Sequence, residues 1–188
     1  MEFFKKRTGA FLVAIAIIAL STFYGAHRSL GAACQEITDS FYSGVYDESW
    51  GTTRTSINSQ LIKRQEAALG IISIASSFPE LEDYVDDLRS SRENLITAKT
   101  VSDLHTANFT LEDDYKKLTS ALSDVELSVS QRDNITAYSS TFKGAQNVID
   151  SSGYNEAVRD FNRRVLNVFP TNLLRSITFV NEPELFDF

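Results

Sequence analysis

The chain has 188 residues, room for one domain and an anchor, and a formal net charge of −7. Residues 1–28 carry a balance of +3, which leaves −10 for the rest, and a domain this acidic is not expected to bind nucleic acid, because nucleic-acid affinity comes from basic groups. One cysteine and two histidines exclude an intrachain disulfide and give no pattern for a zinc site or a Cys-His catalytic arrangement. We therefore expect no catalytic, cofactor-binding or metal-binding residues, and the few prolines and glycines favour an all-α chain.

The first predicted element is a transmembrane helix at residues 9–28. The run from Gly9 to Ala26 carries no charged residue, and about 18 residues in a helix cross about 27 Å at 1.5 Å per residue. Phe23 and Tyr24 give this run an aromatic end of the kind found where a membrane meets water. We interpret it as a retained anchor; a cleaved signal peptide is the alternative, because small residues follow at 31–33.

The charges beside this run predict its orientation. Lys5, Lys6 and Arg7 precede it, whereas Arg28 on the other side is soon followed by acidic residues. Cations beside a membrane helix resist translocation, and acidic groups count for little. We therefore expect a single-pass protein of the cell membrane, with residues 1–8 in the cytoplasm and the domain outside it.

The membrane helix is predicted to run directly into the domain, because apolar residues keep helical spacing from Leu30 to Val45. Cys34 lies on this stripe and is expected to face the core. Residues 46–55 interrupt the pattern. We expect Tyr46 and Trp50 to cover the end of the bundle, and an exposed aromatic contact is the alternative.

Three helices are predicted next, at about 56–76, 78–98 and 102–125. The first is expected to turn Lys63, Arg64 and Glu66 to solvent. Its inward stripe comprises Ile57, Leu61, Ala68, Ile71, Ile72 and Ala75. The second begins at Pro79, since proline suits a first helical turn. Ser102 is expected to cap the third, whose apolar residues follow nearly heptad order.

The last predicted helix is long, from about Ser130 to Phe169, and the sequence from Ser130 resembles a capping box. Its apolar stripe slips by one residue near Gly153, which we interpret as a kink in one helix, with a break into two helices as the alternative. Phe169-Pro170 ends it, because the residue before proline leaves the α region. We expect residues 173–188 to form a tail that docks on the bundle or on the membrane surface.

Two neighbouring stripes run along this last helix. Its apolar stripe comprises Tyr154, Val158, Phe161, Val165 and Val168. Asn155, Arg159 and Asn162 form a polar stripe one position away. Half-covered polar groups need partners, since an unpaired one costs about 1–3 kcal/mol, so we interpret the polar stripe as a structural hydrogen-bond network, with a ligand site as the alternative.

The segment Tyr-Asn-Glu-Ala-Val-Arg-Asp-Phe-Asn at 154–162, followed by Phe-Pro-Thr-Asn at 169–172, resembles the C-terminal signature of the LemA family. These are bacterial proteins with one N-terminal membrane helix and an antiparallel helical bundle. The matching residues are Tyr154, Asn155, Val158, Arg159, Asn162, Phe169, Pro170 and Asn172. The chain departs from the family at residues 46–53, where relatives continue a long first helix.

The resemblance implies a fold and a mode of action. The fold is an antiparallel up-down four-helix bundle of LemA type at residues 29–172, behind the transmembrane helix, with its first helix rooted in the membrane. The expected function is non-enzymatic: an extracytoplasmic interaction or scaffold module for other envelope or membrane proteins, such as TPM-domain proteins or membrane peptidases. A sensor or ligand-binding bundle at the cell surface is the alternative.

Overall fold

The computed structural model describes residues 7–187, so Lys5 and Lys6, which contribute to the predicted orientation, lie outside the described residues. The chain is all-α with an N-terminal candidate membrane span, as predicted. It divides into two compact units. One contains the chain up to Thr38 together with Val158–Pro183, and the other contains Asp39–Ala157 together with Glu184–Phe188. This division differs from the expected segments 9–28, 29–172 and 173–188.

Helix α1 (Arg7–Ser43) is one continuous helix. It confirms that the apolar run passes without a break into the segment that follows. Within the first unit it is joined by the end of α6 (Tyr154–Phe161), by the π-helical turn η4 (Asn162–Leu166) and by α7 (Thr171–Thr178). Val158, Leu166 and Cys34 are buried there, so Cys34 faces a core as expected.

The π-helical turn η4 changes which residues of the last helical segment are inside. The backbone N–H of Asn167 donates to the carbonyl oxygen of Asn162 at 2.9 Å, which widens the turn by one residue compared with an α-helix. Leu166 is buried as a result, while Val165 and Val168 are exposed. The prediction that these two valines face inward is therefore wrong.

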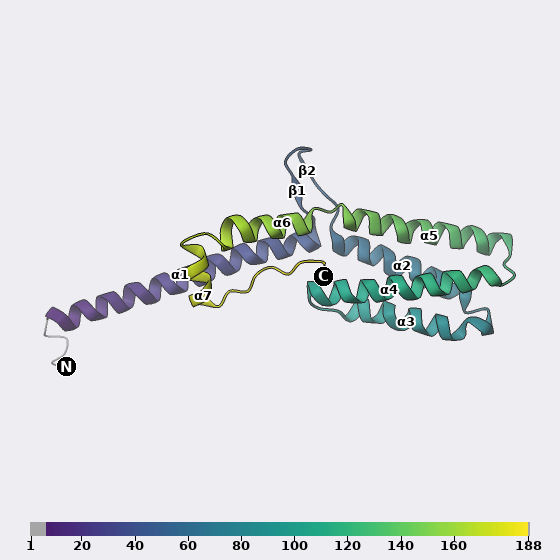
Figure 1. Cartoon of the computed structure of the whole chain (residues 1–188), viewed down its shortest axis with the longest axis horizontal. Helices are drawn as coiled ribbons and strands as arrows, with labels where there is room; N and C mark the ends of the chain where they lie inside the picture. Colours follow the sequence, from purple (N-terminus) through teal and green to yellow (C-terminus); the bar gives the residue numbers. More distant parts are fainter. Residues whose placement is uncertain (1–6, 188) are drawn as a thin grey trace. The chain divides into compact units, whose positions relative to one another are not determined.

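The second unit contains the four-helix bundle, formed by α2 (Ile57–Ala75), α3 (Glu82–Thr97), α4 (Val101–Ala121) and α5 (Val129–Asp150). Figure 1 shows the four helices side by side, each running opposite to the one before it in the chain. Short 3₁₀ turns precede α3 (η2, Pro79–Leu81) and follow α4 (η3, Leu122–Asp124). The bundle helices are thus α2–α5, so the prediction that the first of them is rooted in the membrane is wrong.

The bundle core is aliphatic with aromatic side chains on α4 and α5. Its fully buried apolar residues include Leu61, Ile71, Leu88, Leu95, Leu111, Leu118, Leu122 and Phe142. Helices α2 and α5 approach closely at Gly70, where a Cβ atom would lie 2.5 Å from Cζ of Tyr138. Any larger residue at this position would therefore force the Tyr138 ring to move, because Cβ contacts this short are essentially never seen.

Hydrogen bonds at the helix starts correct two predicted caps. Thr100, not Ser102, caps α4, since its hydroxyl accepts from the backbone N–H of Asp103 at 3.0 Å. Helix α5 begins two residues earlier than expected, with a reciprocal capping box between Ser128 and Gln131 (3.2 and 2.9 Å). Both corrections move the cap to the residue whose side chain reaches the third position of the helix.

The long last helix is broken. Helix α5 ends at Asp150, residues 151–153 are not helical, and α6 begins at Tyr154. Gly153 has φ +78°, a left-handed conformation that glycine adopts without steric cost. The prediction of one continuous helix through Gly153 is wrong, and the alternative of two helices is the observed one.

Candidate functional site

The residues that match the LemA signature are called the motif residues below. The first two of them, Tyr154 and Asn155, bind the C-terminal segment of the chain. The hydroxyl of Tyr154 donates to the carbonyl oxygen of Glu184 at 2.8 Å. The Asn155 amide bonds both backbone groups of Phe186: its nitrogen donates to the carbonyl oxygen at 3.0 Å, and its oxygen accepts from the N–H at 2.8 Å. The tail is therefore bound through its backbone N–H and C=O groups, as a strand is bound by its neighbour in a β-sheet.

Side chains of the tail fill a small aromatic cluster in the same unit. The Phe186 ring is buried, with its centroid 5.5 Å from that of Phe41 and 5.0 Å from that of His105. The Tyr154 ring lies edge-on to Phe41 at 5.4 Å. The Glu184 carboxylate accepts from the backbone N–H of Ser102 in the first turn of α4 at 3.0 Å, where the positive end of the helix dipole favours an acid. Glu184 and Phe186 thus both contact the first turns of α4.

The other motif residues do not join this site. In the first unit Val158 is buried, and the Asn162 amide nitrogen donates to Oε2 of Glu182 at 3.2 Å. Arg159, Phe169, Pro170 and Asn172 are exposed. Contacts of the motif residues thus occur in both units.

Residues 46–53, which were expected to cover the end of the bundle, form a β-hairpin. Strands β1 (Tyr46–Asp47) and β2 (Thr52–Thr53) pair antiparallel. Arg54 fixes the base of the hairpin: Nε and Nη2 donate to Oδ2 of Asp47 at 2.8 and 2.6 Å, and Nη1 donates to the carbonyl oxygen of Ser151 at 3.0 Å. Hydrogen bonds from Ser49 and Arg54 lower the pKa of Asp47 to about 2, so this clamp stays charged at physiological pH.

The hairpin presents its aromatic residues to solvent. Trp50 is 80% exposed and Tyr46 is 61% exposed, so the prediction that they cover the bundle end is wrong and both rings are exposed, as the alternative requires. Figure 1 shows the hairpin extending away from the helices of its unit. Tryptophan is one of the residue types enriched among the energetically dominant residues of protein interfaces. The hairpin therefore presents a residue suited to binding a partner.

The bundle contains a buried arginine, Arg64, that the sequence analysis placed on the solvated side of its helix. Arg64, predicted to be solvated, has no exposed side-chain surface. Its guanidinium pairs with Glu112 and lies over the Phe142 ring. Its Nε and Nη1 have no hydrogen-bond partner in the described part of the chain. Arg64 lies three residues after Leu61 and four before Ala68, and this position on the apolar stripe is the signal that could have identified it.

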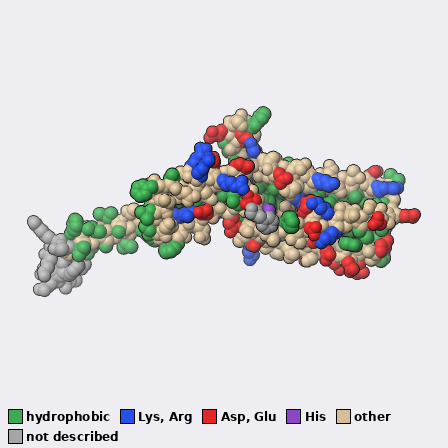
Figure 2. Space-filling model, in the orientation of Figure 1, with side chains coloured by type: hydrophobic (Ala, Val, Ile, Leu, Met, Phe, Trp, Pro, Cys, Tyr) green, Lys and Arg blue, Asp and Glu red, His purple; other side chains and the backbone are tan. Residues whose placement is uncertain are grey.

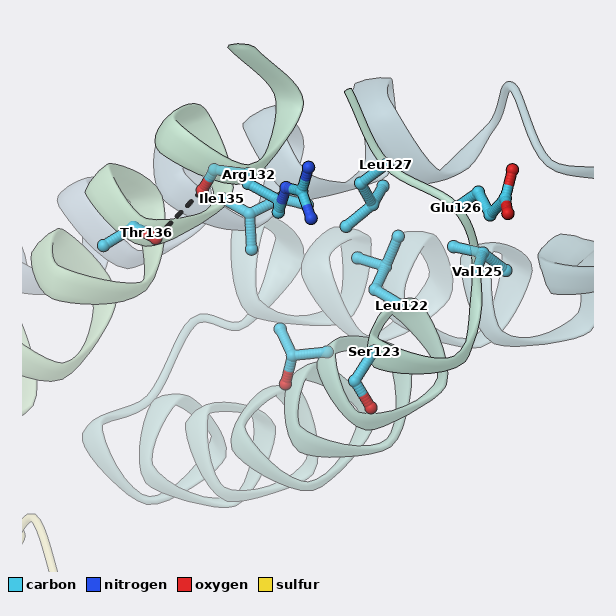
Figure 3. Close-up of a pocket in the computed structure, with 9 residues that line it drawn as sticks. Leu122, Ser123, Val125, Glu126, Leu127, Arg132, Ile135 and Thr136 are labelled. Atoms are coloured by element: carbon cyan, nitrogen blue, oxygen red, sulfur yellow. Dashed lines mark hydrogen bonds between the residues drawn. The ribbon is translucent and has the colours of Figure 1, made fainter. Parts of the chain in front are cut away.

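The second unit has a pocket at one end of the bundle, between the end of α4 and the start of α5. Its volume is about 660 Å³, within the usual range for small-molecule sites. It is lined by Thr119, Leu122, Ser123, Val125, Glu126, Leu127, Arg132, Ile135 and Thr136. Figure 3 shows Arg132 reaching toward Leu127, while Glu126 turns away. Polar and aliphatic side chains both line the pocket, and Arg132 supplies a cation for an anionic group.

The N-terminal part of α1 carries apolar side chains all around the helix. Phe11, Ile18, Leu20 and Tyr24 are among the exposed ones, and Figure 2 shows apolar atoms along this part of the chain. By length and composition α1 can cross a membrane, a test that a signal sequence near the N-terminus also passes.

Two acidic residues near Arg159 in the sequence make local contacts within their own units. Asp160 pairs with Arg163 and Arg164 at 2.5 and 3.1 Å in the first unit. In the second unit Asp150 accepts from the amide of Gln146 at 2.7 Å. Among the described residues no group of three or more His, Cys, Asp or Glu is arranged to hold a metal ion.

No protein-family model, curated protein or solved structure matches the chain.

Proposed function

We propose that the chain is a single-pass membrane protein of LemA type whose helical bundle binds other envelope or membrane proteins and catalyses no reaction. Its N-terminus lies in the cytoplasm and its bundle outside the cell membrane. The LemA resemblance makes TPM-domain proteins and membrane peptidases the first partners to test. The apolar surface of α1 supports the anchor, and the charges beside it support the orientation.

One observation carries the proposed interaction: Trp50, 80% exposed on a hairpin whose base is clamped by Arg54. Tryptophan contributes a large contact area at the cost of ordering few torsions, and a rigid support lowers that cost further. The neighbouring Glu48, which is exposed on the hairpin, favours a partner with an apolar pocket that has a basic residue at its border.

The interaction is tested by co-purification of the full-length protein and of its Trp50→Ala variant after mild detergent extraction. Removal of a hot-spot residue costs about 2 kcal/mol or more, which is over tenfold in Kd, so proteins that co-purify with the wild type should be lost. Phe109→Ala, which removes an exposed aromatic on α4, is the matched control. Retention of every partner by Trp50→Ala would refute the hairpin as the contact.

The topology is tested by cysteine labelling. Cys34 is buried and is replaced by alanine, and a cysteine is introduced by Glu48→Cys, since Glu48 is exposed on the hairpin. A membrane-impermeant thiol reagent should label intact cells. Labelling only after permeabilisation would mean a cytoplasmic bundle. A protein shortened by about 26–33 residues would mean that the apolar run is a removed signal peptide.

The pocket at the bundle end supports a second candidate function, a sensor or ligand-binding bundle. Its aliphatic residues Leu122, Leu127 and Ile135, set among polar ones, and the side chain of Arg132 suit a molecule with a short apolar body and one carboxylate. An alkyl carboxylate such as octanoate should raise the unfolding temperature of the full chain, and Arg132→Gln should weaken that effect. An equal response from the variant would exclude recognition by Arg132.

A further inference from the structure

The first unit carries an apolar surface on and around α7. Phe169 and Phe179, which flank this helix, are 83% and 85% exposed. Leu173 and Ile177 lie one helical turn apart on α7 itself and are also exposed. The exposed Val165, within η4, and Val168, two residues after it, lie in the same unit, and Figure 2 shows apolar atoms gathered over this region. So many exposed large apolar side chains in one short segment indicate an interaction surface.

The position of α7 along α1 indicates what covers this surface. Nδ1 of His27 donates to the carbonyl oxygen of Thr178, the last residue of α7, at 3.0 Å. His27 is the first residue after the uncharged run that ends at Ala26. Helix α7 therefore lies at the level where the apolar surface of α1 stops. In Figure 1 it runs across the direction of α1, so it would lie along the plane of a membrane that α1 crosses.

The two sides of α7 differ in the way an interfacial helix requires. Thr178 is buried, while Leu174 and Arg175 are partly covered, so this side packs on the protein. Of the exposed residues, Leu173 and Ile177 form an apolar flank, and Asn172 and Ser176 form a polar one. A helix of this kind lies with its apolar flank in the boundary between headgroups and acyl chains.

The charges around α7 indicate that the lipid need not be anionic. Arg175 pairs with Glu182, and Arg163 and Arg164 both pair with Asp160. Two acids thus oppose three arginines and leave one net positive charge, so attraction to acidic headgroups is only a small contribution to the contact. Burial of apolar side chains is the expected driving force.

We propose that α7 and the flanking Phe169 and Phe179 form a second membrane contact, in the leaflet where the anchor ends. This inference rests on the proposed membrane anchorage through α1. The anchor and α7 together would give the first unit two points of attachment, so it could not rotate freely about α1.

The test uses tryptophan fluorescence of the full chain in phosphatidylcholine nanodiscs, without bromine and with bromine placed either near the glycerol or near the ends of the acyl chains. Trp50 is the only tryptophan, so the background is Trp50→Phe. Single tryptophans are introduced by Leu173→Trp on the apolar flank of α7, by Asn172→Trp on the polar flank and by Ile18→Trp in the anchor. Bromine quenches tryptophan only at short range, so each variant reports on its own position.

We expect bromine near the glycerol to quench Leu173→Trp, with blue-shifted emission, and bromine near the chain ends to quench Ile18→Trp, which lies at the middle of the uncharged run. Asn172→Trp should be much less affected by either lipid. Quenching of Ile18→Trp without quenching of Leu173→Trp would overturn the second contact while leaving the anchor intact. Absence of quenching at Ile18→Trp would instead refute the anchorage itself. Equal quenching at Leu173→Trp and Asn172→Trp would overturn the orientation of α7.

Discussion

The guanidinium of Arg64 lies 4.0 Å from the centroid of the Phe142 ring. Phe142 is also stacked on Tyr115, with centroids 3.8 Å apart and planes inclined by 6°. A cation from α2, a ring from α5 and a ring from α4 are thus in contact inside the bundle. Burial lowers the pKa of Arg64, while Glu112 opposes this shift. The arginine is therefore a costly but geometrically specific part of the core.

We predict that the two partners of the Arg64–Glu112 pair respond differently to substitution. Glu112→Ala leaves a buried guanidinium without its counter-charge and should lower the free energy of unfolding by about 3–5 kcal/mol. Arg64→Met removes the charge and keeps most of the volume, so stability should stay the same or rise by about 1–4 kcal/mol. Urea unfolding of the full chain in detergent measures both. Equal destabilisation by the two variants would contradict this account.

Replacement by alanine should lower the folding stability at Gly70 and raise it at Gly144. Gly70→Ala forces a Cβ into the Tyr138 ring and should destabilise by about 1–3 kcal/mol through overpacking. Gly144, within α5, has nothing within 4 Å of such a Cβ, so Gly144→Ala should stabilise by about 0.5–1 kcal/mol. Thermal unfolding followed by circular dichroism distinguishes them, and a stabilising Gly70→Ala would rule out the close crossing of α2 and α5.

The position of the α5 cap can be checked with two serines. Ser128→Ala removes the hydroxyl that accepts from Gln131 N–H and should cost about 1 kcal/mol. Ser130→Ala, at the cap expected from sequence, lies inside the first turn and should change stability by less than about 0.5 kcal/mol. The reverse ranking in chemical denaturation would restore the predicted helix start.

Stability should decline in alkaline solution partly because of Tyr154. Burial raises its pKa from 10.0 to about 12, so the folded chain keeps a proton that the unfolded chain loses between these values. The stability from this group is complete below pH 10 and is lost as pH rises toward about 12. The unfolding temperature of Tyr154→Phe should fall less steeply than that of the wild type over this range. Identical slopes would mean that Tyr154 titrates normally.

The tail should loosen when Asn155 is removed. Asn155→Ala deletes both hydrogen bonds to the Phe186 backbone, and each backbone group left unpaired costs about 1–3 kcal/mol. Hydrogen exchange at the Phe186 amide should become much faster, while exchange within α2–α5 stays unchanged. Asn167→Ala, at an exposed position, is the control. Unchanged exchange at Phe186 would show that the aromatic cluster alone holds the tail.

The sequence by itself determined the helices and the apolar run. These features follow from local rules: apolar spacing along α2, α3 and α4, proline at the start of η2, and the absence of charge between Gly9 and Ala26. Each depends on residues within a few positions of one another, so it can be read from one stretch. The same rules located the region of the α5 cap and missed its position by two residues, because several serines there could serve.

The tertiary structure decided what depends on distant partners. Arg64 is buried because Glu112 and Phe142 come from other helices to meet it. Trp50 is exposed because Arg54 ties its hairpin to Ser151, far along the chain. The wide turn at η4 moves burial from Val165 to Leu166 and leaves apolar side chains beside α7 exposed. Helical periodicity gives the direction of a side chain relative to its own helix, but burial depends on what the rest of the fold brings against it.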